Sequence, residues 1–99
     1  MNNLITPDSI ISLSKDQVSC DLGDEAVILG LKDNVYYGLN SLGAFIWDFI
    51  KEPRKVEEVL TKLLEEFDVE KEECKNDLLE LLEELNQKGL IEVKHEAIV

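Results

Sequence analysis

The chain has 99 residues, which is enough for one small domain built around a single core. Its 22 acidic and 10 basic residues give a formal net charge of −12. A surface of this charge repels phosphate backbones and anionic lipids, so we expect no nucleic-acid or membrane partner. A protein or peptide with basic or apolar features fits it better.

The beginning of the chain lacks the basic segment and apolar run of a signal peptide. No apolar run reaches the roughly 20 residues that a membrane span needs. We therefore expect a cytoplasmic protein. Cys20, Cys74 and His95 are too few for the usual four-ligand zinc sites, and we expect both cysteines to be partly buried thiols.

The first 40 residues are rich in turns and β-branched side chains and predict short strands. Residues 1–15 predict an extended or loosely held arm whose apolar positions can add strand or packing contacts. Strands are predicted at residues 17–22, 26–31 and 35–39, joined by tight turns into an antiparallel meander. Residues 26–31 are almost continuously apolar, so we expect them to form a central strand covered on both faces.

A helix is predicted at residues 41–50, directly after the third strand. Asn40 or Ser41 can accept hydrogen bonds from its first free amides. Its apolar residues recur with helical spacing and form a wide stripe. Trp47 lies off this stripe, where it can contact the sheet, the arm or a partner.

Two further helices and a final strand complete the predicted domain at residues 16–94, followed by a tail at residues 95–99. Pro53 ends the first helix, and residues 55–67 form the second. The third runs to about residue 88, where Gly89 is typical of a position just past a helix end. Residues 90–93 predict a short strand or wing. The fold class is therefore α+β and winged-helix-like, with a three-stranded antiparallel sheet, three helices and a short C-terminal strand.

The sequence offers no combination of residues typical of catalysis or of cofactor binding. The single histidine, His95, lies near the C-terminus, and no set of glycines has phosphate-loop or dinucleotide spacing. The helical carboxylates fall mostly on polar faces, where they are solvated charge. We therefore predict no enzyme, no catalytic or metal-binding residues and no cofactor.

The third predicted strand is a candidate docking edge. Val35, Tyr37 and Leu39 share one face, whereas Tyr36 and Gly38 share the other. As the last strand of a meander it exposes unpaired amides and carbonyls, and it lacks the charge or proline that usually guards such an edge. Either it is an ordinary strand with amphipathic tyrosines, or it accepts an incoming strand.

The third predicted helix carries an unusually wide apolar stripe. Leu79 lies about 100° from Leu78, on the flank that also carries Lys75 and Asn86. Either Leu79 contacts the second helix, or it lines a groove beside the sheet edge. A strand edge next to an apolar helix flank forms a peptide-binding groove. The narrower centre of the stripe comprises Cys74, Leu78, Leu81, Leu82 and Leu85.

The stretch AVILGLKDNVYYGLNSLGAFIWDFI, followed by two helices and KGLIEV, resembles the PqqD-like family. This family comprises the recognition elements that bind leader peptides of ribosomally synthesised, modified peptides. The segment YGLNSLGA at residues 37–44 is similar to the strand-to-helix junction of the family. The resemblance covers about residues 16–94 and is greatest to the separate recognition proteins of lasso-peptide biosynthesis.

The resemblance implies that a leader peptide adds as an antiparallel strand to the third predicted strand, beside the third helix. It also implies a separate cysteine leader peptidase as partner. The implied leader-binding residues are Val35, Tyr36, Tyr37, Gly38 and Leu39 on the strand, with Lys75, Leu78, Leu79 and Leu82 on the helix.

Two alternatives remain open at this point. The chain can serve another modifying enzyme, such as a radical enzyme in a PqqD-type pathway, or act as a general protein–protein adaptor. A DNA-binding winged helix is disfavoured, because residues 70–88 carry three lysines against seven acids where a basic recognition helix is required.

Overall fold

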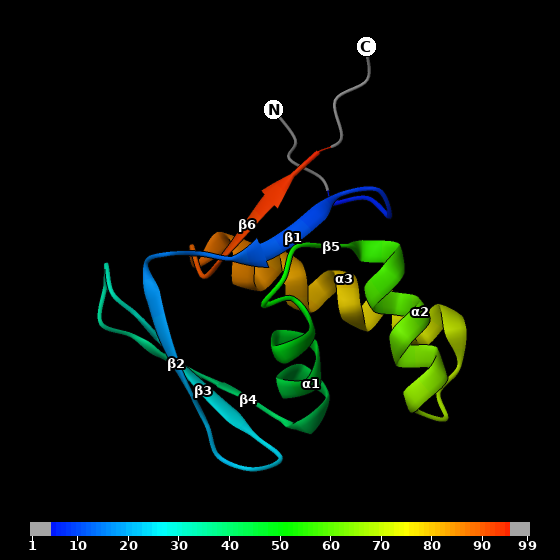
Figure 1. The fold of residues 1–99 in the computed structure, drawn as a ribbon, viewed down its shortest axis with the longest axis horizontal. Coiled ribbons are helices and arrows are strands. Elements are labelled where there is room, and N and C mark those ends of the chain that lie inside the picture. The colour runs from blue at the N-terminus through cyan, green and yellow to red at the C-terminus, as the bar shows by residue number, and fades with distance from the viewer. Residues whose placement is uncertain (1–4, 96–99) are drawn as a thin grey trace.

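The computed structural model describes residues 5–95, which form two three-stranded antiparallel sheets and three helices (Figure 1). One sheet has the order β2-β3-β4 and the other β5-β1-β6. None of the helices described combines the length and apolar composition that a membrane crossing requires. In chain order the elements are β1 (Ile10–Leu13), β2 (Gln17–Asp21), β3 (Ala26–Gly30), β4 (Tyr36–Leu39), α1 (Ser41–Phe49), β5 (Arg54–Lys55), α2 (Val56–Glu66), α3 (Lys71–Gln87) and β6 (Ile91–Lys94).

The β2-β3-β4 sheet is the predicted meander, with β3 in its centre. However, β3 is not covered on both faces as expected. Ala26 and Ile28 are buried at 2% and 0% exposure, whereas Val27 and Leu29 are only partly buried. The apolar run predicted two covered faces, but α1 packs on one face alone. Cys20 of β2 is likewise exposed, contrary to expectation, whereas Cys74 is buried.

The second sheet includes the N-terminal segment, which was predicted as an arm able to add strand or packing contacts and forms β1. β1 pairs with β6 on one side and with β5 on the other. Ile11, at 0% exposure, lies in the core. Two backbone bonds continue the contact, because the Val56 amide donates to the Ser9 carbonyl at 2.9 Å and the Glu57 amide donates to the Pro7 carbonyl at 3.0 Å. Both partners of β1 are distant in sequence, so no local pattern signals this sheet. The predicted C-terminal strand is confirmed as β6.

The helix boundaries follow the predicted capping signals. The Asn40 side chain accepts a hydrogen bond from the Gly43 amide at 2.9 Å and caps α1. α3 ends at Gln87, Lys88 is its C-cap, and Gly89 follows with a positive φ of 72°. Each helix turns an apolar face to a common core, and Trp47 is part of that core at 2% exposure.

We predict that Ile11→Ala lowers the free energy of unfolding by about 2–5 kcal/mol, because it leaves a cavity in the core beneath β1. Urea denaturation followed by the fluorescence of Trp47, the single tryptophan of the chain, measures this change. The matched control Val69→Ala, at a position 43% exposed, stays within about 0.5 kcal/mol of wild type. Equal stabilities for the two variants would show that the second sheet contributes little.

Candidate binding site

The outer edge of β4 is open among residues 5–95, because β3 is its one strand neighbour there. The Gly30 amide donates to the Val35 carbonyl at 3.0 Å, so these two residues form a hydrogen-bonded pair between β3 and β4. Along an antiparallel ladder, hydrogen-bonded pairs alternate with pairs that are not hydrogen-bonded. Tyr37, two residues after Val35, therefore also directs its backbone groups toward β3. Tyr36 and Gly38 therefore direct one N–H and one C=O each toward the open side.

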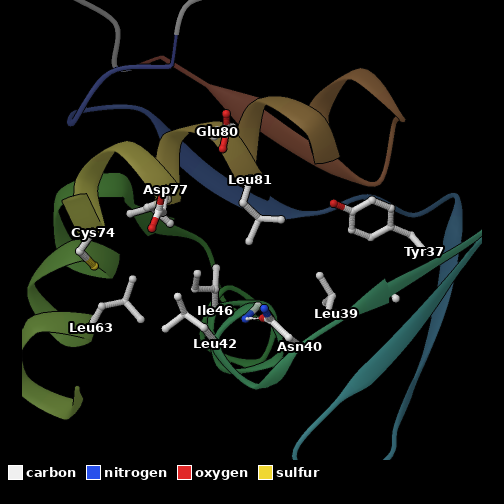
Figure 2. A pocket seen from close by; sticks show the side chains of 13 residues that line it. Tyr37, Leu39, Asn40, Leu42, Ile46, Leu63, Cys74, Asp77, Glu80 and Leu81 are labelled. Atoms are coloured by element: carbon white, nitrogen blue, oxygen red, sulfur yellow. Dashed lines mark hydrogen bonds between the residues drawn. The ribbon is translucent and has the colours of Figure 1, made fainter. Parts of the chain in front are cut away.

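A cavity of about 280 Å³ lies beside this edge, between β4, α1 and α3 (Figure 2). Leu42 and Ile46 of α1 form one wall, and Leu81 points into the cavity from α3. The lining is mixed, with leucines and Ile46 beside Asn40, Asp77 and Glu80. In full, it consists of Tyr37, Gly38, Leu39, Asn40, Leu42, Gly43, Ile46, Leu63, Cys74, Asp77, Leu78, Glu80 and Leu81.

Acidic side chains of α3 stand at the rim. Asp77 and Glu80 line the cavity, and its lining contains no basic residue. One turn beyond Glu80, Glu84 accepts a hydrogen bond from the Tyr37 hydroxyl at 2.9 Å. The Lys88 ammonium lies 5.7 Å from the centre of the Tyr37 ring. Tyr37 thus links the open strand to α3 at one end of the cavity.

The surroundings of Tyr37 favour its neutral form. Burial, the hydrogen bond to Glu84 and the negative charge of that carboxylate together raise the pKa of Tyr37 to about 12. Burial and the charge of Asp77 also raise the pKa of the Cys74 thiol. The thiol in the cavity is therefore a poor nucleophile near neutral pH. Among the described residues, no group of three or more His, Cys, Asp or Glu side chains is arranged to hold a metal ion.

The structure brings some of the predicted site residues to the cavity and leaves others outside it. Tyr37, Gly38, Leu39 and Leu78 line it. Tyr36 is 70% exposed on the opposite face of β4. Val35 lines a smaller hollow together with Tyr37 and Lys88. Lys75 and Leu79 do not line the main cavity. Leu82 is buried in the core at 0% exposure.

The lining also contains residues that sequence reasoning did not select. Leu42, Ile46 and Leu63 belong to α1 and α2, which the sequence does not place against β4. Asp77 and Leu81 lie on the other flank of α3 from Leu79. The helical spacing of residues 77, 81, 84 and 88 places them on one face of α3, and this pattern could have identified the face that lines the cavity. Which flank turns toward β4 depends on the rotation of α3 in the packed domain.

The family comparison matches residues 25–91 to Coenzyme PQQ synthesis protein D (PqqD). The chain belongs to the PqqD family. The match spans the β3–β4 hairpin, all three helices and the start of β6, and so includes both walls of the cavity. The resemblance seen in the sequence is thereby confirmed.

Two solved structures are similar over most of the chain. TbiB1 in complex with the TbiA(beta) leader peptide is 32% identical, with a TM-score of 0.77, and the match covers 82% of this chain and 94% of TbiB1. Lasso peptide synthetase B1 complexed with the leader peptide is 21% identical, with a TM-score of 0.73, and shares the fold over 83% of this chain and 96% of its own. No curated protein matches the sequence.

The environment of Tyr37 predicts that its hydroxyl ionises at a higher pH than that of a solvent-exposed tyrosine. In a Tyr36→Phe variant, Tyr37 is the remaining tyrosine, and ultraviolet absorbance reports its phenolate. We expect the native chain to stay mostly protonated at about pH 11, where the urea-unfolded chain is mostly ionised. Because the folded pKa lies above the unfolded value, this group stabilises the fold fully below about pH 10 and loses its contribution between about pH 10 and 12.

Adding Glu84→Gln to that variant removes the carboxylate charge and lowers the Tyr37 midpoint. Trp47 fluorescence verifies that the chain is folded at each pH. An unchanged midpoint would assign the effect to burial alone.

Proposed function

We propose that this protein binds the leader segment of a ribosomally synthesised precursor peptide and is not itself catalytic. The peptide adds to β4 as an antiparallel strand, and its side chains enter the cavity between β4, α1 and α3. The observation that carries this proposal is the open β4 edge directly beside a cavity whose lining includes Leu42, Ile46 and Leu81. The similarity to TbiB1, a structure with a leader peptide bound, supports it.

The hydrogen-bonding phase of β4 predicts how the peptide aligns. Peptide residues opposite Tyr36 and Gly38 exchange backbone hydrogen bonds with them. The peptide residue between these two lies opposite Tyr37, and its side chain shares the face of the Tyr37 ring. Alternate peptide side chains therefore point toward α3. Apolar residues suit these positions, and the acidic rim at Asp77 and Glu80 favours basic rather than acidic neighbours.

Backbone pairing and burial of apolar side chains both contribute to the affinity for the peptide. Backbone bonds to the two outward residues contribute about 1 kcal/mol each, and each buried apolar side chain contributes about 1.5–3 kcal/mol. Ordering the peptide costs about 2–5 kcal/mol, and association costs several more. We expect a Kd between low micromolar and nanomolar, which corresponds to about −8 to −12 kcal/mol.

The chemistry of the cavity favours recognition without catalysis. Cys74 is the one thiol in its lining, and burial keeps that thiol protonated. His95 accepts or donates a hydrogen bond with Ser9 at 3.1 Å, outside the lining, so it is no base for this thiol. The nucleophile for leader removal then belongs to a separate protein, for which we propose the cysteine leader peptidase of a lasso-peptide pathway.

Calorimetric titration with the leader peptide encoded beside this gene tests the proposal. We expect saturable binding in the micromolar range or tighter, and its loss when the leader sequence is scrambled. Absence of binding to the folded protein would contradict leader recognition. Binding of unrelated peptides with equal affinity would favour a general adaptor.

Gly38→Pro tests the strand-addition geometry. Proline removes the outward amide of Gly38 but not the bonds between β3 and β4, so the sheet persists while binding weakens about tenfold or more. The matched control is Gly38→Ala, because a Cβ at Gly38 meets nothing within 4 Å. We expect this variant to bind like wild type. Equal binding by a folded proline variant would rule out pairing at this residue.

A second pair of variants identifies the flank of α3 that contacts the peptide. Leu81 and Leu79 are both partly buried leucines, but Leu81 alone lines the cavity. We expect Leu81→Ala to weaken leader binding about tenfold and Leu79→Ala to leave it nearly unchanged. Urea denaturation of both variants corrects for differences in stability. The reverse ranking would assign the peptide to the flank that carries Lys75 and Leu79.

A further inference from the structure

The face of the β2-β3-β4 sheet that points away from α1 is apolar and uncovered by the described residues. The strand register places Val18 of β2, Leu29 of β3 and Tyr36 of β4 side by side on it. Val18 is 52% exposed and Tyr36 is 70% exposed. In Figure 1 the sheet stands at one side of the molecule, with α1 against its inner face.

The ladder between β2 and β3 continues beyond both strands and lengthens this face. The Leu22 amide donates to the Glu25 carbonyl at 2.8 Å, and the Leu31 amide donates to the Asp16 carbonyl at 2.8 Å. Because side chains alternate along a strand, Leu22 and Leu31 point to the same side as Val18 and Leu29. We define the outer face as Val18, Cys20, Leu22, Val27, Leu29, Leu31, Tyr36 and Gly38, an uncharged set that is flanked at its two ends by the acidic partners of Leu22 and Leu31, Glu25 and Asp16.

The distribution of charge around the outer face indicates what covers it. Asp24 and Glu25 stand at the β2–β3 turn, and no lysine or arginine occurs within residues 16–31. At the opposite end, Lys32 pairs with Asp16 at 3.4 Å. A partner that is apolar in its centre and basic toward the β2–β3 turn is complementary to this pattern. A second copy of the chain is not, because it brings the same acidic rim and a net charge of −12.

We propose that the outer face is the docking surface for the leader peptidase that processes the bound precursor. This inference rests on the proposed function, since Tyr36 and Gly38 belong both to the outer face and to the β4 edge. A protein seated on the outer face therefore lies next to a peptide paired with β4. The peptide occupies the edge of β4 and the cavity on its inner side, the enzyme occupies the outer face, and both bind simultaneously.

Biolayer interferometry with the purified leader peptidase encoded beside this gene tests the assignment. Val18→Glu places a charge on the outer face, at an exposed position on β2, the strand farthest from β4. We expect it to weaken peptidase binding about tenfold or more. The matched control Ser19→Glu adds the same charge to the neighbouring, exposed residue on the inner face and binds like wild type. Wild-type affinity in Val18→Glu, or no binding by the unmodified chain, would overturn the assignment.

A leader titration of the same variants separates this inference from the proposed function. Val18→Glu retains leader affinity if the two surfaces are distinct. If the unmodified chain binds the peptidase but not the leader, the proposed function fails and the docking surface stands. Sedimentation velocity completes the test: a concentration-dependent dimer that Val18→Glu abolishes would assign the outer face to a second copy instead.

Cysteine footprinting gives a second readout without substitution. Cys20 is exposed on the outer face, whereas Cys74 is buried and its thiol pKa is raised, so alkylation reports Cys20. We expect the peptidase to slow alkylation of Cys20 severalfold and the leader peptide alone to leave it unchanged. A rate unaffected by saturating peptidase would overturn the proposal.

Discussion

β4 is held in place by β3, α1 and the Tyr37–Glu84 hydrogen bond to α3, and the alternation of its residues determines how the rest of the domain is used. Along the strand, one set of residues bonds to β3 and turns its side chains inward, toward α1 and α3. The other set, Tyr36 and Gly38, leaves its backbone groups unpaired and faces outward. A shift of one residue in register would exchange the two sets and bury the exposed Tyr36 in place of Leu39. Burial of Leu39, which is 5% exposed, therefore also determines that the backbone amides of Tyr36 and Gly38 are the ones left unpaired on the open side of β4.

The junction between β4 and α1 keeps the cavity next to this edge. Asn40 ends the strand and caps the helix through the Gly43 amide, so α1 begins one residue after β4 ends. A Cβ at Gly43 would lie 3.1 Å from the Leu39 Cδ2 atom, so glycine permits this close approach. Leu42 and Ile46, on the first turns of α1, are thereby brought to the cavity wall. On the far side, the Tyr37–Glu84 hydrogen bond fixes α3 against the same strand.

Local patterns in the sequence were sufficient for the elements that are regular and adjacent. The meander, the three helices, the caps at Asn40 and Gly89 and the unguarded edge all follow from residue spacing and turn chemistry. The second sheet was missed because β1 pairs with β5 and β6, which are remote in sequence. The apolar run of β3 was misleading for a related reason. It indicated that both faces are suited to burial, but not that α1 covers only one.

The residues that line the candidate site were selected from the sequence on the strand side and only partly on the helix side, and the difference has a physical cause. A strand has two faces and a fixed period, so the residues of β4 could be sorted from the sequence alone. A helix such as α3 offers a continuous range of rotations, and its apolar stripe was wide enough to allow either flank to face β4. Packing against α2 and β6 selects the rotation that presents Leu81. Leu79 packs at the margin of the core instead.

The strong negative charge resolves a conflict that these exposed features create. An unguarded strand edge and an uncharged sheet face both promote association between identical chains. The usual protection, a lysine or proline within the edge strand, would obstruct the pairing that the edge is proposed to provide. Here the protection is distributed: seven acids on α3 and its cap, and the acids at the β2–β3 turn, repel another copy without occupying the β4 edge or the centre of the outer face. Repulsion of this kind discriminates by charge, so it disfavours a second copy while admitting a peptide or protein with basic residues. Net charge thus acts here as a specificity element, and it leaves the backbone of β4 free for binding.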